Sequence, residues 1–328
     1  MRIAVIEVGH WHASGYIEGV LDLGLDIAAV SDRDMDTAQQ WADRLGCRAY
    51  DDYRKLLDRE SPDFVFAHGI HCEMTDIADA LVEHGTPFVM EKPMGVDWQR
   101  LAKVADKAER KGLFAGVDLP NRCRRLTRAL LDLKRRAELG SVTAYTQRLL
   151  AGEPRRYHEW NVPWVLDPKQ AGGGPLFNFG PHVIDMFLLF SGQEVQTVFC
   201  RSGRKLHGLE VEDHAVMVLS TAEGVIATLE VGYVCPGEMY DQSLWFCTDR
   251  LFVTTKHYDA GTISFRDGRI VELTPEDAEP GMNYVEETLR RFESGEPPVA
   301  SIRDMCRALR IINAAVESAE KGSPVNIV

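Results

Sequence analysis

The sequence lacks long apolar runs, paired cysteines and an excess of positive charge. No apolar stretch among its 328 residues approaches the roughly 20 residues that a membrane-spanning helix needs. The seven cysteines are dispersed without a C-x-x-C pair, which is typical of reduced thiols in a cytoplasmic protein, so neither a disulfide framework nor a metal site is predicted. The formal net charge of −13 disfavours phosphate-rich partners, so we expect no nucleic acid and no membrane surface as a partner.

The chain also shows no signal-peptide pattern, because residues 1–8 read as a strand that begins at once. A hydrophobic content of 45% and a charged content of 27% are ordinary for a soluble globular protein. A chain of 328 residues exceeds one usual core, so two domains are expected.

Strands and helices alternate through the first part of the chain. Alternation of this kind predicts an α/β fold with a parallel, doubly wound sheet, whose ligand crevice lies outside the carboxyl ends of the strands. The predicted strands are residues 2–8, 26–30, 49–50, 64–67, 87–90 and 113–117, and the predicted helices are 17–21, 37–45, 53–57, 74–84 and 98–111.

The first strand–helix–strand unit has the length and the terminal acid of a dinucleotide-binding unit, but it lacks two glycines. On the G-x-G-x-x-G pattern only Gly9 is present, and Glu7 and His12 replace the outer glycines. Asp32 follows Gly9 by 23 residues, where an acid accepts hydrogen bonds from the ribose hydroxyls of NAD. Arg33 leaves NADP open, since arginine can pair with a 2′-phosphate. The alternative is a unit that no longer binds a dinucleotide.

Other candidate residues follow the strand ends and should border the same crevice. Lys92, in Glu91-Lys92-Pro93, follows a buried strand, where it can hold a substrate hydroxyl and a cofactor ribose together; the alternative is a structural turn. The predicted cofactor-binding residues are Val8, Gly9, His10, Trp11, Asp32, Arg33, Ala67, His71, Glu91 and Lys92.

The second part of the chain has clustered strands with few helices between them, which predicts an α+β domain with a large, mostly antiparallel open sheet. Such a sheet face is a plausible surface for a homodimer or homotetramer. The expected domains are a dinucleotide-binding domain at 1–121, a substrate and oligomerisation domain at 122–301, and a helix and tail at 302–328 that pack back on the body.

Two stretches of this second part are candidates for substrate binding. The loop around residues 155–164 places Tyr157, Trp160 and Trp164 among arginines, a composition that suits a sugar-like ring, although its aromatic rings could equally pack over the core. The stretch 172–185 begins with three glycines and carries Asn178 and His182 at helical spacing, ahead of an aspartate at 185. Its alternative is a hydrogen-bonded pair inside the core.

These features together resemble the glucose–fructose oxidoreductase/inositol dehydrogenase/rhizopine-catabolism (Gfo/Idh/MocA) family over nearly the whole chain. The resemblance rests on the Rossmann unit, Glu91-Lys92-Pro93 and the 172–185 segment in the family's order. It implies that Lys92 positions the reacting hydroxyl and the nicotinamide ribose, and that His182 is the acid/base. The family's aspartate four residues before that histidine is Asn178 here.

The resulting hypothesis is an enzyme, an NAD(P)-dependent oxidoreductase that transfers a hydride between a nicotinamide cofactor and a hydroxyl carbon of a sugar, inositol or related polyol. NAD is the expected cofactor and NADP the alternative. The predicted catalytic residues are Lys92, His182 and Asn178, and the predicted substrate residues are Arg122, Tyr157, Trp160, Trp164, Asn178 and His182. A non-catalytic dinucleotide- or sugar-binding sensor and an NAD-dependent glycoside hydrolase stay open as alternatives.

Overall fold

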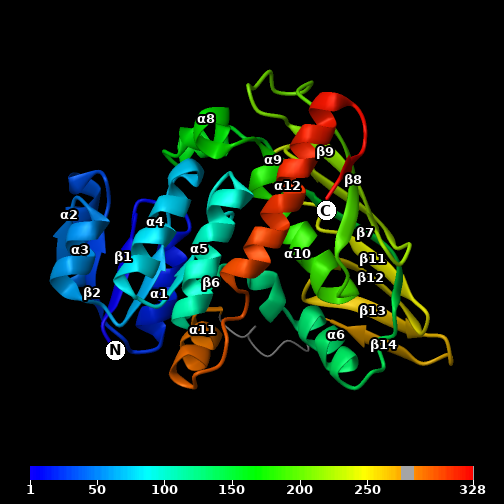
Figure 1. Ribbon diagram of the computed structural model, residues 1–328, viewed down its shortest axis with the longest axis horizontal. Helices are drawn as coiled ribbons and strands as arrows, with labels where there is room; N and C mark the ends of the chain where they lie inside the picture. Colours follow the sequence, from blue (N-terminus) through cyan, green and yellow to red (C-terminus); the bar gives the residue numbers. More distant parts are fainter. Residues whose placement is uncertain (275–283, 328) are drawn as a thin grey trace. The chain divides into compact units, whose positions relative to one another are not determined.

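The computed structural model describes residues 1–274 and 284–327, which form two compact units. Of these residues, unit 1 holds 1–118, 160–164 and 284–306, and unit 2 holds 119–159, 165–274 and 307–327. Each unit contains one sheet (Figure 1). Among the described helices, none is both long enough and apolar enough to cross a membrane.

Unit 1 is built on a six-stranded parallel sheet with the order β3-β2-β1-β4-β5-β6, so the predicted doubly wound sheet is confirmed. Its strands read as continuous apolar runs because helices cover both faces of such a sheet. The strands are β1 (Ile3–Ile6), β2 (Ile27–Ser31), β3 (Arg48–Tyr50), β4 (Phe64–Ala67), β5 (Phe88–Met90) and β6 (Ala115–Val117). The helices are α1 (Ala13–Asp22), α2 (Met35–Leu45), α3 (Tyr53–Glu60), α4 (His71–His84), α5 (Trp98–Lys111) and α11 (Tyr284–Glu293).

The segment around α11 belongs to unit 1, although the sequence placed residues up to 301 in the second domain. The Tyr284 hydroxyl donates a hydrogen bond of 2.6 Å to the Val117 carbonyl at the end of β6. The Phe292 ring lies 5.0 Å from the ring of Phe64 and 5.5 Å from that of Phe114. These long-range contacts leave no signal in the local sequence pattern.

Unit 2 is built on a nine-stranded sheet with the order β14-β13-β12-β11-β7-β10-β9-β8-β15, in which only β7 and β10 are parallel neighbours among the described strands. Its strands are β7 (Val142–Leu150), β8 (Val195–Gly203), β9 (His214–Thr221), β10 (Ile226–Gly232), β11 (Leu244–Thr248), β12 (Leu251–His257), β13 (Ala260–Phe265), β14 (Ile270–Leu273) and β15 (Val325–Asn326). Its helices are η1 (Pro120–Cys123), α6 (Arg125–Arg135), α7 (Arg156–Glu159), α8 (Pro168–Ala171), α9 (Pro175–Asn178), α10 (Gly180–Ser191) and α12 (Ile302–Lys321, from Arg307 on), with η2 (Pro163–Leu166) at the boundary between the units.

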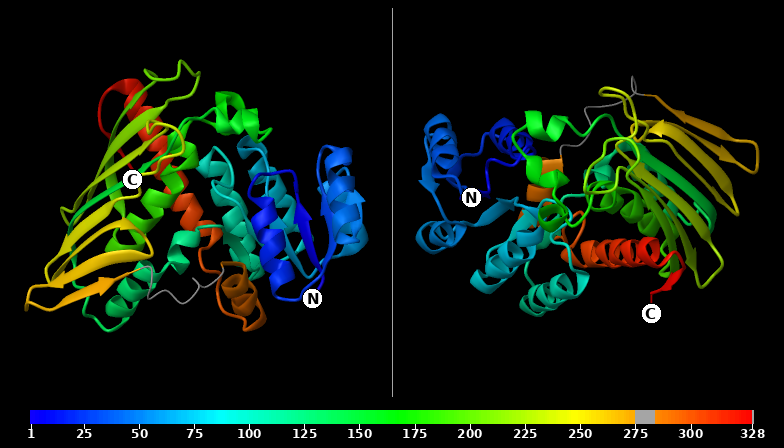
Figure 2. Two further views of the ribbon diagram at one scale, coloured as in Figure 1. Left: turned by 180° about the vertical axis from the view of Figure 1, so that it is seen from behind. Right: turned by 90° about the horizontal axis from the view of Figure 1, so that it is seen from above.

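Helices cover one face of the unit 2 sheet and leave the other open. Helices α6, α10 and α12 all lie on the same side of the strands (Figures 1 and 2). The strands alternate buried and more exposed residues accordingly, as in β7. The exposed large apolar side chains on these strands are Val218, Ile226, Trp245, Phe252, Ile270 and Val271.

Candidate active site

In unit 1 a polar residue follows the end of almost every parallel strand. Glu7 follows β1, Asp32 follows β2, His68 follows β4, Glu91 follows β5 and Asp118 follows β6, and all five are buried. The carboxyl ends of parallel strands meet at one edge of the sheet, so the topology gathers these groups. Buried ionisable side chains need partners or a function.

The loop after β1 keeps the turn of a dinucleotide-binding unit without its first glycine. Glu7 adopts the left-handed conformation, with φ at 54°, and its carbonyl accepts a hydrogen bond of 3.1 Å from the His10 amide. A side chain in this conformation costs about 1–2 kcal/mol relative to glycine. Burial raises the pKa of Glu7, and Arg33 opposes that shift.

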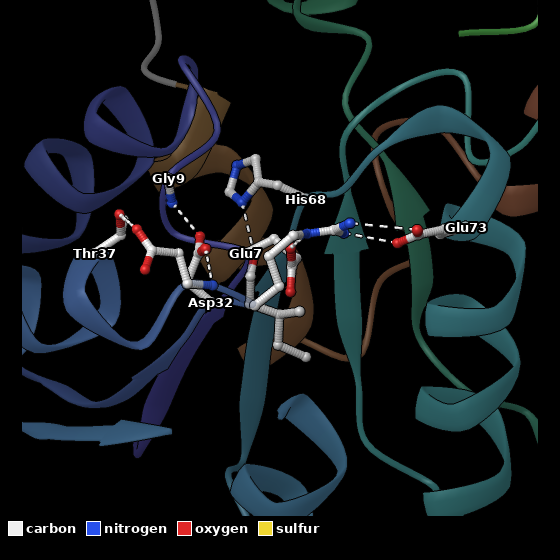
Figure 3. Close-up of polar contacts among 9 residues, drawn as sticks. Glu7, Gly9, Asp32, Thr37, His68 and Glu73 are labelled. Atoms are coloured by element: carbon white, nitrogen blue, oxygen red, sulfur yellow. Dashed lines mark hydrogen bonds and ion pairs between the residues drawn. The ribbon is translucent and has the colours of Figure 1, made fainter. Parts of the chain in front are cut away.

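Gly9 and Asp32 pack directly against one another. The Asp32 carboxylate accepts 2.7 Å from the Gly9 amide and 2.9 Å from the Asp34 amide (Figure 3). A β-carbon on Gly9 would lie 2.9 Å from the Asp32 carboxylate and 3.0 Å from the Thr37 methyl, so a larger residue would require these two side chains to shift. Burial is the main cause that raises the pKa of Asp32, although both amides counteract it.

Arg33 is held by two carboxylates. Its Nε donates 2.8 Å to Glu7, and its two Nη atoms lie 2.6 and 3.3 Å from the oxygens of Glu73 on α4 (Figure 3). The Glu7 carboxylate therefore engages a cation, rather than standing alone as a repulsive charge. Glu73 was not among the predicted residues, although its place in the first turn of the helix after β4 could have suggested it.

A pocket of about 190 Å³ opens beside these groups, and the short segment 160–164 forms one of its walls. Trp164 lies with its ring 4.9 Å from that of His71 and 5.6 Å from that of Trp11. His10 stacks on Trp11 at 3.8 Å. The lining residues are Glu7, Gly9, His10, Asp32, Arg33, Asp34, Thr37, Gly69, Ile70, Asn161, Val162 and Trp164.

Lys92 and Glu91 are buried after β5, where the Lys92 ammonium lies 3.5 Å from Glu91. The His12 imidazole, which is partly exposed, lies 3.1 Å from the other Glu91 oxygen. Burial alone would raise the pKa of Glu91, but His12 and Lys92 outweigh it and hold that pKa well below its usual value. Burial lowers the pKa of Lys92, and burial together with Glu91 raises that of Asp118 well above normal.

Unit 2 places the residues of the glycine-rich stretch on two consecutive helices. Asn178 ends α9, whereas His182 lies in the first turn of α10, so the predicted polar face does not run along one continuous helix. The buried Asn178 amide nitrogen donates 2.7 Å to the Tyr157 hydroxyl and 3.0 Å to the Tyr233 hydroxyl. Tyr157 therefore helps to position Asn178.

Arg122 and Asp185 form a two-bond ion pair within unit 2. Arg122 Nη2 and Nε lie 2.6 and 3.0 Å from the two Asp185 oxygens, and the two side chains are only 12% and 3% exposed. This pair connects η1 to α10.

Two of the three glycines before α9, Gly173 and Gly174, lie close to Glu212. A β-carbon on Gly174 would lie 2.1 Å from the Glu212 carbonyl. The buried Glu212 carboxylate accepts 2.9 Å from the Gly174 amide and 3.0 Å from the Leu176 amide. Gly174 therefore serves the close packing of the chain against the Glu212 backbone, where a side chain would collide.

The predicted cofactor residues all lie in unit 1, and four of them, Gly9, His10, Asp32 and Arg33, line the pocket. Val8 and Ala67 contribute buried apolar side chains to the core. The predicted substrate residues divide: Trp160 and Trp164 belong to unit 1, and Arg122, Tyr157, Asn178 and His182 belong to unit 2. Within the described ranges, no group of three or more histidine, cysteine or acidic side chains could hold a metal ion.

Comparison with known proteins matches both parts of the chain. Residues 1–119 match the oxidoreductase family model with the NAD-binding Rossmann fold, and residues 127–253 match the GFO/IDH/MocA C-terminal domain. A D-xylose 1-dehydrogenase (NADP(+)) of Haloferax volcanii is 26% identical over 92% of each chain. A myo-inositol 2-dehydrogenase of Thermotoga maritima is 24% identical over 100% of this chain and 98% of its own.

Solved structures show the same fold. An inositol dehydrogenase homologue of Azotobacter vinelandii complexed with NAD+ has a TM-score of 0.88 at 17% identity and covers 100% of this chain and 97% of its own. Levoglucosan dehydrogenase in complex with NADH and levoglucosan has a TM-score of 0.87 at 17% identity, covering 100% and 99%. With its Rossmann unit and its C-terminal domain both matched, the chain belongs to the Gfo/Idh/MocA family of oxidoreductases.

Proposed function

We propose that the protein is an NAD-dependent dehydrogenase or reductase that acts on a hydroxyl carbon of a sugar, inositol or related polyol. The observation that carries the proposal is the set of groups after the parallel strands of unit 1. Asp32 after β2 is suited to a ribose, and the buried Lys92 after β5 is suited to a reacting hydroxyl.

The residues of unit 1 fit a nicotinamide dinucleotide. Gly9 has no side chain to cover its backbone, and a β-carbon there would come within 2.9 Å of Asp32, so glycine suits the close approach of a pyrophosphate. Asp32 is already oriented by two amides, so its carboxylate is fixed in place for ribose hydroxyls. Trp164 and His10 bring aromatic rings to the same pocket, and Trp164 packs edge-to-face against the buried His71.

Lys92 and His182 divide the proton chemistry in this proposal. Lys92 donates a hydrogen bond to the hydroxyl oxygen, and its burial lowers its pKa, which eases exchange of its proton. His182 as a neutral imidazole takes the hydroxyl proton during oxidation and returns it during reduction. When bound, the nicotinamide accepts or supplies the hydride at the same carbon.

Asn178 has a positioning role here. Its side-chain amide donates to the hydroxyls of Tyr157 and Tyr233, which fix the end of α9 just before the helix that carries His182. An amide carries no charge, so Asn178 cannot raise the basicity of His182 as the family's aspartate would.

The substrate class is supported by the relatives, whose names include D-xylose, D-glucoside and myo-inositol dehydrogenases. The test is to assay the purified protein with NAD and with NADP against these polyols, following reduced nicotinamide by absorbance. Lys92→Ala and His182→Asn should each lower kcat about 10²–10⁴-fold, the usual contribution of a positioned acid or base. Lys103→Ala, at an exposed lysine of α5, is the control and should keep full activity.

Three results would overturn this assignment. Turnover that survives both substitutions would remove Lys92 and His182 from the chemistry. Tight dinucleotide binding without turnover on any polyol would instead favour a non-catalytic binding protein, and release of a nitrophenyl group from glycosides would favour the hydrolase.

The open face of the unit 2 sheet is proposed as a surface for self-association into a homodimer or homotetramer. It exposes Ile226 at 58%, Trp245 at 40% and Phe252 at 39% on three strands, which is a large apolar content for a solvated face. Light scattering should therefore give a mass above one chain, and Ile226→Glu with Trp245→Glu should reduce it to the mass of one chain.

A further inference from the structure

Glu7, Arg33 and Glu73 form a three-membered ion cluster beside Asp32, which we call the Arg33 clamp. Three guanidinium nitrogens are engaged: Nε with Glu7 at 2.8 Å, and Nη2 and Nη1 with Glu73 at 2.6 and 3.3 Å. The two carboxylates come from different elements, the loop after β1 and the first turn of α4 (Figure 3). The arginine is therefore held from two sides.

The position of Glu7 in this cluster depends on its unusual backbone. Glu7 occupies the left-handed conformation at the place where dinucleotide-binding units have glycine, and its side chain is only 11% exposed. A non-glycine residue in this conformation is strained, and such strain concentrates at functional sites. Glycine would relax the turn but would provide no carboxylate for Arg33.

The clamp matters because Arg33 is the sole arginine or lysine among the described residues that line the pocket. A free arginine next to the acid that binds ribose would pair with the 2′-phosphate of NADP. In this chain, such pairing would break charge-assisted bonds to Glu7 and Glu73. It would also bring a phosphate dianion close to the carboxylates of Asp32, Glu7 and Glu73.

We propose that Glu7 and Glu73 set the cofactor preference of this chain by holding Arg33 away from a 2′-phosphate, so that NAD is selected over NADP. The inference rests on the proposed dinucleotide-binding function and deepens it. Asp32 alone disfavours a 2′-phosphate, and the clamp engages Arg33, the one arginine or lysine that the described pocket lining offers to compensate.

The test measures dinucleotide binding by calorimetry, with no need for turnover. NADH and NADPH are titrated into the wild type, Glu7→Gln, Glu73→Gln and the double variant. The double variant should bind NADPH at least about tenfold more tightly than the wild type does, because Arg33 is then free to make a charge-assisted bond. Adding Arg33→Ala to the double variant should abolish that gain. Glu73→Gln tests the role of the clamp without altering the left-handed turn at Glu7, since Glu73 lies on α4, where its side chain is half-exposed.

Asp76→Asn is the matched control, since Asp76 lies on the same helix and pairs with Arg100 rather than Arg33. It removes one negative charge from α4 and should leave the preference for NADH unchanged. A gain in NADPH binding that persists without Arg33, or no gain in the double variant, would overturn the inference.

The same titrations separate this inference from the proposed function. Binding with the expected preference but no turnover would support the clamp and count against the dehydrogenase. Absence of binding by either dinucleotide in every variant would refute both.

Discussion

Replacing Arg122 with alanine should destabilise unit 2 rather than act first on substrate binding. The sequence placed Arg122 among the substrate residues, but its guanidinium makes bonds of 2.6 and 3.0 Å to Asp185 on α10. With side chains 12% and 3% exposed, the pair is largely removed from solvent screening. Alanine would leave the Asp185 carboxylate buried without this partner.

The expected loss in the free energy of unfolding can be estimated from this geometry. Removing one member of a buried ion pair costs about 3–5 kcal/mol, chiefly because the remaining charge is desolvated. Arg122→Lys retains the charge but not the planar fork, so a smaller loss of about 1–2 kcal/mol is expected. Replacing both residues, as Arg122→Met with Asp185→Leu, removes the charges together and should recover most of the stability.

Urea unfolding followed by circular dichroism, with hydrogen exchange in peptides from α10, measures the effect. Arg124→Ala is the control, because the Arg124–Asp259 pair has an arginine 47% exposed and should contribute less than about 1 kcal/mol. The reasoning would be refuted if Arg122→Ala changed the free energy of unfolding by less than about 1 kcal/mol while raising the KM for the polyol.

Three further outcomes are expected. Asp32→Ala should weaken NADH binding at least about 10–100-fold in calorimetry, because a single hydrogen bond to a charged group contributes about 1.5–3 kcal/mol; unchanged binding would exclude this crevice. Burial lowers the pKa of His68 from 6.5 to about 4, so the unfolded state binds more protons in that window. The free energy of unfolding should therefore stay constant above pH 6.5 and fall by about 3 kcal/mol as the pH drops to about 4. His68→Leu should reduce this dependence on pH in urea titrations, and an unaltered dependence would show that His68 does not cause it. Asn178→Asp should keep the fold, because both tyrosine hydroxyls can donate to the new carboxylate. It should change the pH profile of kcat, and an unchanged profile would show that residue 178 does not affect proton transfer.

The parallel strands were predictable because burial on both faces gives continuous apolar runs, as in Phe64–Ala67. The edge strands of the second sheet were not predictable from the sequence. Strand β14, Ile270–Leu273, has no buried residue, and β15 has only two residues, so neither carries the alternation that marks a half-buried strand. Helix α11 was missed because its apolar face contacts residues far away in sequence, such as Phe64.

The positions of the candidate site residues followed from topology, but their partners did not. A residue within one or two positions after a parallel strand lies at the ligand edge of the sheet, which is why Asp32 and Lys92 could be named in advance. The pairing of Arg122 with Asp185 spans 63 residues, and no local spacing encodes it. Local sequence also did not indicate the contacts of segment 160–164. This segment was expected to contact substrate, and in the structure it lines the pocket of unit 1.

Glu7 shows how a departure from a motif can be interpreted differently once its contacts are known. In the sequence it removes a glycine and adds a negative charge near the expected pyrophosphate. In the structure its backbone still adopts the left-handed turn of that glycine, and its carboxylate pairs with Arg33 at 2.8 Å. The turn costs about 1–2 kcal/mol, and a charge-assisted bond contributes about the same amount in the opposite sense. The two terms offset each other, so loss of the glycine does not imply loss of the binding site, and restoring it would free Arg33 from one of its two carboxylates.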